Sequence, residues 1–182
     1  MDDLICMVTG ATSGIGKAVA ESIAKRGDTL LLIGRNELKT QEVLREIKKS
    51  SGNENISYIL ADLSSQDEIR KLVLDIYEKY SRLDILINNA GSVFMSRAES
   101  IDGIEMTFAL NHLSYFLISN LLLPLILRSD NGRIINVSSK AHESSHINFS
   151  DPQFKKNYNV IRAYGRSKLA NLLFSYQMAK KV

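Results

Sequence analysis

A tyrosine and a lysine near the end of the chain have the types and the spacing needed for acid–base chemistry. Tyr164 and Lys168 are four residues apart, so on a helix they lie on the same face. A free tyrosine, with a pKa of about 10, is a poor base near neutral pH, and a neighbouring ammonium favours its phenolate form. Such a tyrosine can exchange a proton with a carbonyl or an alcohol while a nicotinamide exchanges a hydride. Tyr-x-x-x-Lys pairs also arise by chance on helices, so the pair needs support from other segments.

A glycine-rich turn near the start of the chain has the composition of a phosphate-binding turn. Its sequence, TGATSGIG over residues 9–16, follows an apolar run and precedes helical spacing. Glycine permits positive φ and close backbone approach, and a helix N-terminus offers free N–H groups and a positive dipole end. The spacing is neither GxGxxG nor that of a Walker A loop, and a purely structural turn is the alternative. The residues expected to line a pyrophosphate are Gly10, Thr12, Ser13, Gly14, Ile15 and Gly16.

An arginine after the second apolar run indicates which dinucleotide binds. NAD sites usually have an acidic residue about 20 residues past the glycines, where it binds the ribose 2′-hydroxyl. This chain has Gly34-Arg35-Asn36 there, and the guanidinium of Arg35 suits a 2′-phosphate. Lys17 is a second candidate for that phosphate, and a solvated arginine without a ligand is the alternative. We expect NADP(H) to be preferred over NAD(H), with Arg35 and Asn36 at the cofactor site.

The elements that must position these residues alternate along the chain. Continuous apolar runs separated by amphipathic helical spacing predict an α/β fold whose parallel sheet is covered on both faces. Ser64 and Asp67 resemble a capping box before one of the helices. We expect a single domain over residues 1–182, with ligands at the carboxyl ends of the strands of a doubly wound sheet. The strand-like runs are 4–9, 30–33, 56–61, 83–88 and 133–137, and the main helical segments are 15–26, 36–50, 69–80, 107–127 and 161–180.

Composition narrows the class of protein further. The chain has 182 residues, 45% hydrophobic, with a net charge of +3, which is too small to indicate a nucleic-acid or membrane surface. One cysteine allows no internal disulfide and fits a cytoplasmic location. Acidic residues follow Met1, so no signal peptide is expected. The apolar run 113–127 is shorter than the roughly 20 residues that span a bilayer, and we interpret it as a buried helix.

Several short motifs follow one another in register. They are Thr9–Gly16, Asp62-Leu63, Asn88-Asn89-Ala90-Gly91, Asn111, Ser138-Ser139 and Tyr164-x-x-x-Lys168. Their order is typical of the short-chain dehydrogenase/reductase family, which the chain resembles over essentially its whole length. Three segments resemble retinol dehydrogenase-like members more closely: Asn111-His112-Leu113, Ser138-Ser139-x-Ala141-His142 and Ser167-Lys168-Leu169-Ala170-Asn171.

The resemblance implies an NADP(H)-dependent oxidoreductase that interconverts a carbonyl and an alcohol, with Tyr164 as the general acid/base. Lys168 would hold the nicotinamide ribose, so it and Tyr164 would also contact the cofactor. Ser139 would orient the substrate oxygen, and Asn111 would support a water-linked proton relay. The resemblance also implies a cofactor-binding role for Asp62, Leu63, Asn89, Ala90 and Gly91.

The chain departs from the family pattern in two places. Ser139 and Tyr164 are 25 positions apart, which is longer than usual, although retinol dehydrogenase-like members carry a similar insertion. Only 14 residues follow Lys168, where the family continues with further strands and a substrate-covering loop. We therefore expect a Rossmann-type sheet of five strands in the order 3-2-1-4-5, with the C-terminal strands of the family missing. The alternative function is a non-catalytic dinucleotide-binding module, or a truncated fragment of such an enzyme.

The remaining expectations concern metals and partners. His142 and His146 match HExxH, but they follow a strand in a serine-rich loop without an evident third ligand, so no metal site is expected. The expected partner is a small carbonyl or alcohol, with no nucleic acid and no membrane. The two long helices, at 107–127 and 161–180, resemble those through which family members form homodimers or homotetramers.

Overall fold

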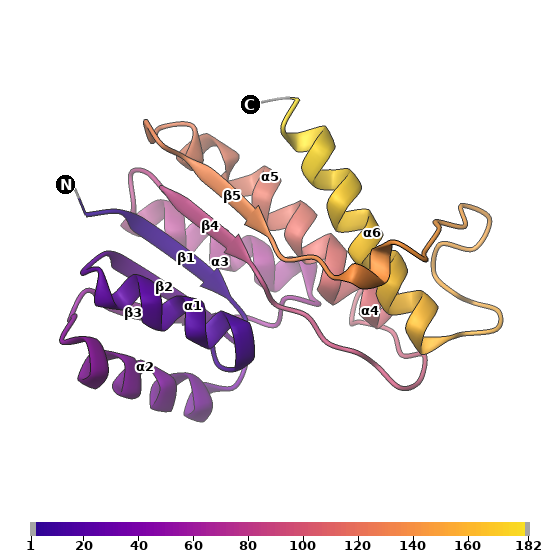
Figure 1. Cartoon of the computed structure of the whole chain (residues 1–182), viewed down its shortest axis with the longest axis horizontal. Helices are drawn as coiled ribbons and strands as arrows, with labels where there is room; N and C mark the ends of the chain where they lie inside the picture. The colour runs from indigo at the N-terminus through magenta and orange to yellow at the C-terminus, as the bar shows by residue number, and fades with distance from the viewer. Residues whose placement is uncertain (1–2, 181–182) are drawn as a thin grey trace.

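A five-stranded parallel sheet forms the centre of the fold. The computed structural model describes residues 3–180, and the strand order is β3-β2-β1-β4-β5, so the order predicted from the sequence is confirmed. Every pair of neighbouring strands is parallel (Figure 1). The strands are β1 (Ile5–Thr9), β2 (Thr29–Gly34), β3 (Ile56–Leu60), β4 (Ile85–Asn88) and β5 (Arg133–Asn136).

Helices cover both faces of this sheet (Figure 1). One face packs against α1 (Gly14–Lys25) and α2 (Glu37–Ser51). The other packs against α3 (Gln66–Lys79) and α5 (Ser114–Ile126), with α6 (Val160–Met178) in contact with α5 and β5. The shorter elements are α4 (Met106–Phe108), the π-helical turn η1 (Ala109–Leu113) and the 3₁₀ turn η2 (Lys140–His142).

The inner strands β1, β2 and β4 are mostly apolar because each contributes to two separate cores, whereas the edge strand β5 contributes to one. In β1, Cys6 and Val8 pack toward α1 and α2, whereas Met7 packs toward α3 and α5. In β2, Leu30 and Leu31 divide between the two cores in the same way. Side chains of a strand alternate between its faces, so a sheet covered on both faces requires continuous rather than alternating hydrophobicity.

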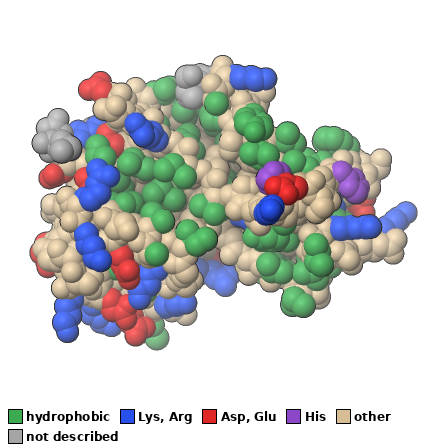
Figure 2. All heavy atoms as spheres, in the orientation of Figure 1, with side chains coloured by type: hydrophobic (Ala, Val, Ile, Leu, Met, Phe, Trp, Pro, Cys, Tyr) green, Lys and Arg blue, Asp and Glu red, His purple; other side chains and the backbone are tan. Residues whose placement is uncertain are grey.

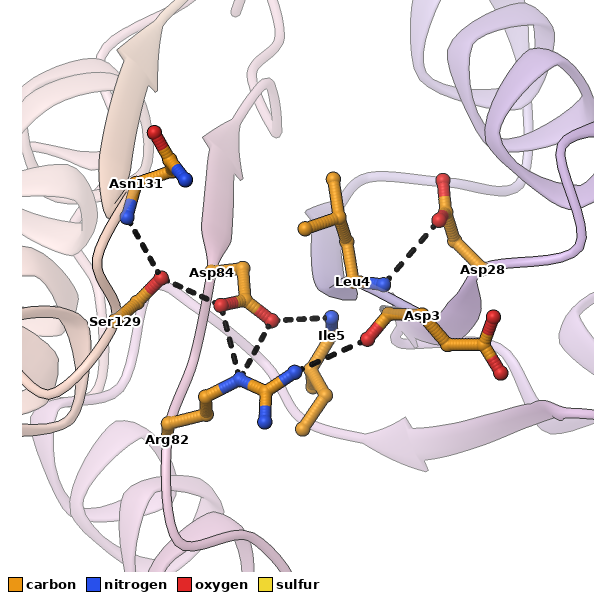
Figure 3. Close-up of polar contacts among 8 residues, drawn as sticks. All are labelled: Asp3, Leu4, Ile5, Asp28, Arg82, Asp84, Ser129 and Asn131. Atoms are coloured by element: carbon orange, nitrogen blue, oxygen red, sulfur yellow. Dashed lines mark hydrogen bonds and ion pairs between the residues drawn. The ribbon is translucent and has the colours of Figure 1, made fainter. Parts of the chain in front are cut away.

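A polar cluster holds the amino ends of the strands together, opposite the edge where ligands are expected (Figure 3). The buried Asp84 carboxylate accepts hydrogen bonds from the Ile5 N–H (2.7 Å), Arg82 Nε (3.0 Å) and the Ser129 hydroxyl (2.5 Å). Although burial opposes the charged form, these hydrogen bonds lower the pKa of Asp84. Arg82 also donates to the Asp3 carbonyl oxygen. The cluster therefore ties β1 to the segments that enter β4 and β5.

The cap of α3 differs from the sequence prediction by one residue. Ser65 is the N-cap, and its hydroxyl accepts a hydrogen bond from the Glu68 N–H (3.4 Å). The Ser64 hydroxyl instead donates to the Asp62 carboxylate (2.7 Å). The pairing of Ser64 with Asp67 is therefore wrong, because Asp62 competes for Ser64 and two adjacent serines made the register ambiguous.

The helix before β5 matches the predicted segment 107–127 to within one residue at each end and extends beyond the apolar run 113–127. Helical turns continue over Met106–Ile126, which is 21 residues with a mean hydropathy of 1.4, and half of its most apolar window is buried inside the protein. Within residues 3–180 it is the one helix whose length and composition would suffice to cross a membrane. Buried core helices share those properties, so the segment alone is weak support for a membrane protein.

Candidate active site

A cleft of about 360 Å³ lies at the carboxyl ends of the strands. Its walls come from the turn after β1, the ends of β2 and β3, the segment after β4 and one residue of η1. In an open parallel sheet this edge binds ligands where successive connections leave in opposite directions, here between β1 and β4. The sequence-predicted residues that line the cleft are Gly10, Thr12, Ser13, Gly14, Ile15, Arg35, Asp62, Leu63, Asn89, Ala90 and Gly91. The sequence analysis missed Ile33, Gly34, Ala61 and Leu110.

Some of the missed residues could have been predicted from the sequence and others could not. Gly34 and Ala61 directly precede predicted cleft residues at strand ends, so their small size was an available signal. Leu110 comes from η1, and only the packing of that helical segment against the sheet brings it to the cleft.

The β1–α1 turn presents the start of α1 to the cleft. Ser13 is the N-cap residue with extended backbone (φ −163°), and within the described chain its side chain makes no capping hydrogen bond. The first N–H groups of a helix lack intrahelical acceptors, and an anion at this point satisfies them. Gly16 does not line the cleft. It lies beneath the turn, where a Cβ would clash with the Gly10 carbonyl oxygen and the Asn89 amide nitrogen.

Side-chain hydrogen bonds lock this turn to the end of β4. The Thr9 hydroxyl accepts from the N–H groups of Asn89 (2.9 Å) and Ala90 (3.0 Å) and donates to the Ile87 carbonyl oxygen (3.3 Å). The Asn89 amide donates in turn to the carbonyl oxygens of Thr9 (2.9 Å) and Gly10 (3.3 Å). The two cleft walls are therefore held at a fixed separation before any ligand binds.

The far end of the cleft carries one exposed guanidinium. Arg35 is paired with Asp62 at 3.4 Å, and the Arg35 side chain is 72% exposed. Burial works against the charge of Asp62, but hydrogen bonds from Ser64 and the charge of Arg35 lower the Asp62 pKa. Exposed ion pairs of this kind contribute roughly 0–1 kcal/mol, so a ligand phosphate can compete for Arg35.

The other two residues expected near the 2′-phosphate lie elsewhere. Asn36 does not line the cleft; it is the N-cap of α2, where its side chain accepts from the Lys39 N–H (2.9 Å). Lys17 is directed to α2, where its ammonium forms an ion pair with Glu46 at 2.5 Å. Lys17 does not line the cleft, so the structure gives no support to the expectation that it assists Arg35, which stays a prediction.

The predicted tyrosine–lysine pair lies on α6, beside the nicotinamide end expected of the cleft. The Lys168 ammonium is 5.8 Å from the centre of the Tyr164 ring and donates to the Val137 carbonyl oxygen (3.0 Å). A Cβ placed on Gly91, in the cleft wall, would be 3.7 Å from the Lys168 nitrogen. Burial lowers the pKa of Lys168 to about 8. The lysine therefore lies between the cleft and the tyrosine.

Asn111 is held in the π-helical turn η1, which the sequence analysis did not predict. Its Oδ1 accepts from the Ser92 N–H (2.9 Å), and its Nδ2 donates to the Ser92 carbonyl oxygen (2.9 Å) and the Ser167 hydroxyl (3.2 Å). The Asn171 amide donates to the Asn111 backbone carbonyl oxygen (2.8 Å). π-Turns inside helices are frequent at functional sites. Asn111 therefore links the chain after β4 to α6.

Ser139 lies at the start of η2, a turn that contacts α6, the helix that carries Tyr164 and Lys168. Ser139 follows β5 as the N-cap of η2, where its hydroxyl accepts from the Ala141 N–H (3.3 Å). His142 ends η2 and its Nδ1 lies 2.7 Å from the Ser139 carbonyl oxygen. His146 lies in the loop beyond, so the HExxH residues do not share an α-helix face, as a zinc site of that type requires.

A buried tyrosine beside Lys168 was not identified from the sequence. Tyr115 is fully buried, its ring centre is 5.5 Å from the Lys168 nitrogen, and its hydroxyl has no hydrogen-bond partner among the described residues. Burial, and then the nearby Tyr164, raise the pKa of Tyr115 above its ordinary value. Tyr115 is four residues after Asn111, so helical spacing was the signal that could have placed both on one face.

Comparisons with known proteins agree with this arrangement. Residues 4–182 match the family described as short chain dehydrogenase. Retinol dehydrogenase 11 of Homo sapiens is 39% identical over 178 residues, which are 98% of this chain and 56% of that protein. Retinol dehydrogenase 13 of Homo sapiens is 40% identical, over 97% of this chain and 54% of that protein. The chain thus spans about half the length of these relatives.

A solved structure shares the fold. The RhlG/NADP active-site complex of Pseudomonas aeruginosa superposes with a TM-score of 0.78 at 32% sequence identity. The match covers 98% of this chain and 66% of that one.

Proposed function

The chain belongs to the short chain dehydrogenase family, and on that premise we propose that it binds NADP(H) in preference to NAD(H) and interconverts a carbonyl and an alcohol. The substrate is a small molecule whose oxygen exchanges a proton with Tyr164. Retinol dehydrogenases among its relatives agree with an alcohol or carbonyl substrate without identifying which one.

The residues of the cleft fit a dinucleotide. Its volume of about 360 Å³ is within the usual range of roughly 300–1,000 Å³ for ligand pockets. The start of α1 suits a pyrophosphate, and the Arg35 guanidinium at the far end suits a 2′-phosphate. At the opposite end, Asn89, Ala90 and Gly91 form a wall next to Lys168. A bound nicotinamide cofactor supplies or accepts the hydride.

The remaining chemistry belongs to side chains of this chain. We assign Tyr164 the proton transfer and Lys168 the contact with the ribose. We assign Ser139 the positioning of the substrate oxygen and Asn111 the support of a water-linked proton relay. The Asn111 side chain itself is held by Ser92 and Ser167.

The observation that carries the proposal is the place of Lys168. Its ammonium lies beside the cleft wall at Gly91 and also within 5.8 Å of the Tyr164 ring centre. A lysine that is 4% exposed is rare outside functional or paired sites. Here it connects the dinucleotide cleft to the proton-transfer group.

Substitution of Tyr164 tests the activity. We expect Tyr164→Phe to lower turnover on a panel of aldehydes, ketones and alcohols by about 100-fold or more, because general acid–base catalysis contributes 10²–10⁴-fold. Affinity for NADPH, measured by fluorescence, should stay within about twofold, because the cleft wall is intact.

Two results would count against the assignment. Full turnover by the phenylalanine variant would remove Tyr164 from the reaction. A wild-type chain that binds NADPH but converts no member of the panel would instead support a non-catalytic dinucleotide-binding module.

A further inference from the structure

A second cavity, of about 420 Å³, lies on the loop side of α6 and shares no lining residue with the dinucleotide cleft. It is enclosed by the long connection between η2 and α6, which projects from the body of the molecule (Figure 1). Basic and histidine side chains gather on this projecting part of the surface (Figure 2). The lining residues are Ser144, Ser145, His146, Asn148, Asp151, Phe154, Lys156, Asn157, Arg162 and Arg166.

The cavity holds a buried arginine with few protein partners. Arg166 is 3% exposed, and its guanidinium lies 3.5 Å from the centre of the Phe154 ring. Of its five N–H donors, the described residues engage one nitrogen, through a hydrogen bond from Nη1 to the Asp151 carbonyl oxygen (2.8 Å). The Nε and Nη2 atoms make no hydrogen bond among the described residues and are not fully buried, so both are open to solvent and available to an anion.

The charges around Arg166 favour an anion. Lys156 and Arg162 are exposed cations on the cavity wall, and Asp151 is the one carboxylate in that wall. The buried Glu105 is a second carboxylate whose charge acts on Arg166. The Asp151 carboxylate is already used, because its oxygens accept from the backbone N–H groups of Lys155 (2.9 Å) and Lys156 (3.1 Å). The Glu105 carboxylate is likewise used, because it accepts from the backbone N–H groups of Thr107 and Phe108. Three cations therefore face two carboxylates that are already hydrogen-bonded to backbone N–H groups.

The loop also offers neutral donors and an unusual backbone. The Asn148 side-chain oxygen accepts from the Ser150 N–H (3.0 Å), and its amide nitrogen makes no hydrogen bond among the described residues. Phe154 (φ +47°) and Asn157 (φ +52°) are non-glycine residues in the left-handed region. Such conformations are sparsely populated for residues other than glycine and recur at ligand clamps.

We propose that this cavity binds a small phosphate-bearing ligand, held by Arg166, Arg162 and Lys156. Arginine presents its donors in a planar fork that matches phosphate oxygens, and lysine adds a mobile point charge. The volume of about 420 Å³ leaves room for the organic part of a phosphomonoester. This site is independent of the proposed oxidoreductase function, because it uses neither the cleft residues nor Tyr164 and Lys168.

The test follows backbone and arginine side-chain NMR signals while inorganic phosphate or glycerol phosphate is titrated into the chain. NADPH is present in excess, so that phosphate does not enter the dinucleotide cleft, and sodium chloride at equal ionic strength is the reference. We expect saturable shifts confined to residues 144–166. Arg162→Gln and Lys156→Gln should each weaken binding by about threefold to tenfold, since both side chains are exposed and fold-neutral.

The matched control is Arg45→Gln, which removes an equally exposed cation from α2 and should leave phosphate affinity unchanged. Equal weakening by all three variants, or shifts confined to residues 10–16, would overturn the proposal. If NADPH itself fails to bind, the proposed function fails, but shifts at 144–166 still decide this one. A last experiment compares phosphatidylcholine vesicles with and without phosphatidic acid. If the signals of residues 144–166 shift with phosphatidic acid but not with glycerol phosphate, the ligand is a lipid headgroup. If they shift with glycerol phosphate but not with phosphatidic acid, the ligand is a soluble phosphomonoester.

Discussion

At the scale of single residues, the site depends on how a lysine is kept beside a tyrosine without a carboxylate next to it. Lys168 has a neutral hydrogen-bond acceptor, the Val137 carbonyl oxygen, and two aromatic rings around its ammonium. Burial without an opposite charge disfavours the ammonium, which explains the lowered pKa of about 8. Burying the charged Lys168 therefore lowers the free energy of unfolding.

This cost predicts a pH dependence of stability. Lys168 loses its proton near pH 8 in the folded chain and near 10.5 when unfolded, so the unfolded chain binds more protons between these values. The free energy of unfolding attributable to Lys168 should therefore rise from pH 8 to 10.5, by up to about 3 kcal/mol. Urea unfolding of the chain and of Lys168→Met across this range isolates the contribution as a difference.

The comparison with Lys168→Met is needed because a second buried group works in the opposite direction. Burial raises the pKa of the Cys6 thiol to about 12, so above pH 9 the folded chain holds a proton that the unfolded chain releases, and stability falls. Both proteins share this loss. Parallel pH profiles for the two would show that Lys168 is not desolvated as the structure places it.

The sequence predicted the residues that face the cleft better than those that support them. Arg35 was found in the cleft wall because its chemical type carries information by itself, and spacing singled out Tyr164 and Lys168, which lie on α6 outside the lining of the cleft. The place of Tyr115 depends on a helix packing against another helix, which residue types alone do not reveal. The pairing of Lys17 with Glu46 likewise depends on how α1 lies against α2.

At the scale of elements, two glycines of the β1–α1 turn have different roles. Gly16 lies where a Cβ would clash with the Gly10 carbonyl oxygen, whereas Gly14 (φ +53°) has open space around the same position. We expect Gly16→Ala to lower the free energy of unfolding by about 2–3 kcal/mol through overpacking. Gly14→Ala should cost about 1 kcal/mol through backbone strain alone. Urea titrations of both variants measure the difference, and a larger loss for Gly14→Ala would contradict this account of the turn.

The strands were predictable and the irregular turns were not. Apolar runs located all five strands to within two residues at each end, because a sheet with a core on both faces leaves continuous hydrophobicity in the sequence. The π turn at Ala109–Leu113 has no comparable signature. Its backbone hydrogen bonds join residues five apart, so the helix is wider there. The hydrogen-bond partners of the Asn111 side chain are Ser92 and Ser167 of α6.

At the scale of the whole molecule, the outer faces of α5 and α6 carry exposed apolar side chains. Phe116 is 46% exposed, Leu173 48% and Tyr176 62%. Apolar groups on neighbouring long helices suit a self-complementary interface. This supports the expectation of a homodimer or homotetramer, which stays a prediction.

Light scattering coupled to size-exclusion chromatography measures this prediction. We expect an oligomer for the chain and a shift toward monomer for Leu173→Asp, because a charge in an apolar interface is costly. Leu74→Asp is the matched control, since Leu74 is an exposed leucine on α3 (63%). A monomeric wild-type chain would contradict the prediction.

The central claim is that the cleft at the ends of β1 to β4 is an NADP(H) site, and a fluorescence titration with NADPH and NADH tests it most directly. We expect the Kd for NADPH to be about 10–100-fold lower than that for NADH, the range of a charge-assisted contact with the 2′-phosphate. Arg35→Gln should remove this preference and leave the affinity for NADH unchanged. Equal affinities for the two cofactors would contradict the role of Arg35, and no binding of either would contradict the cofactor site itself.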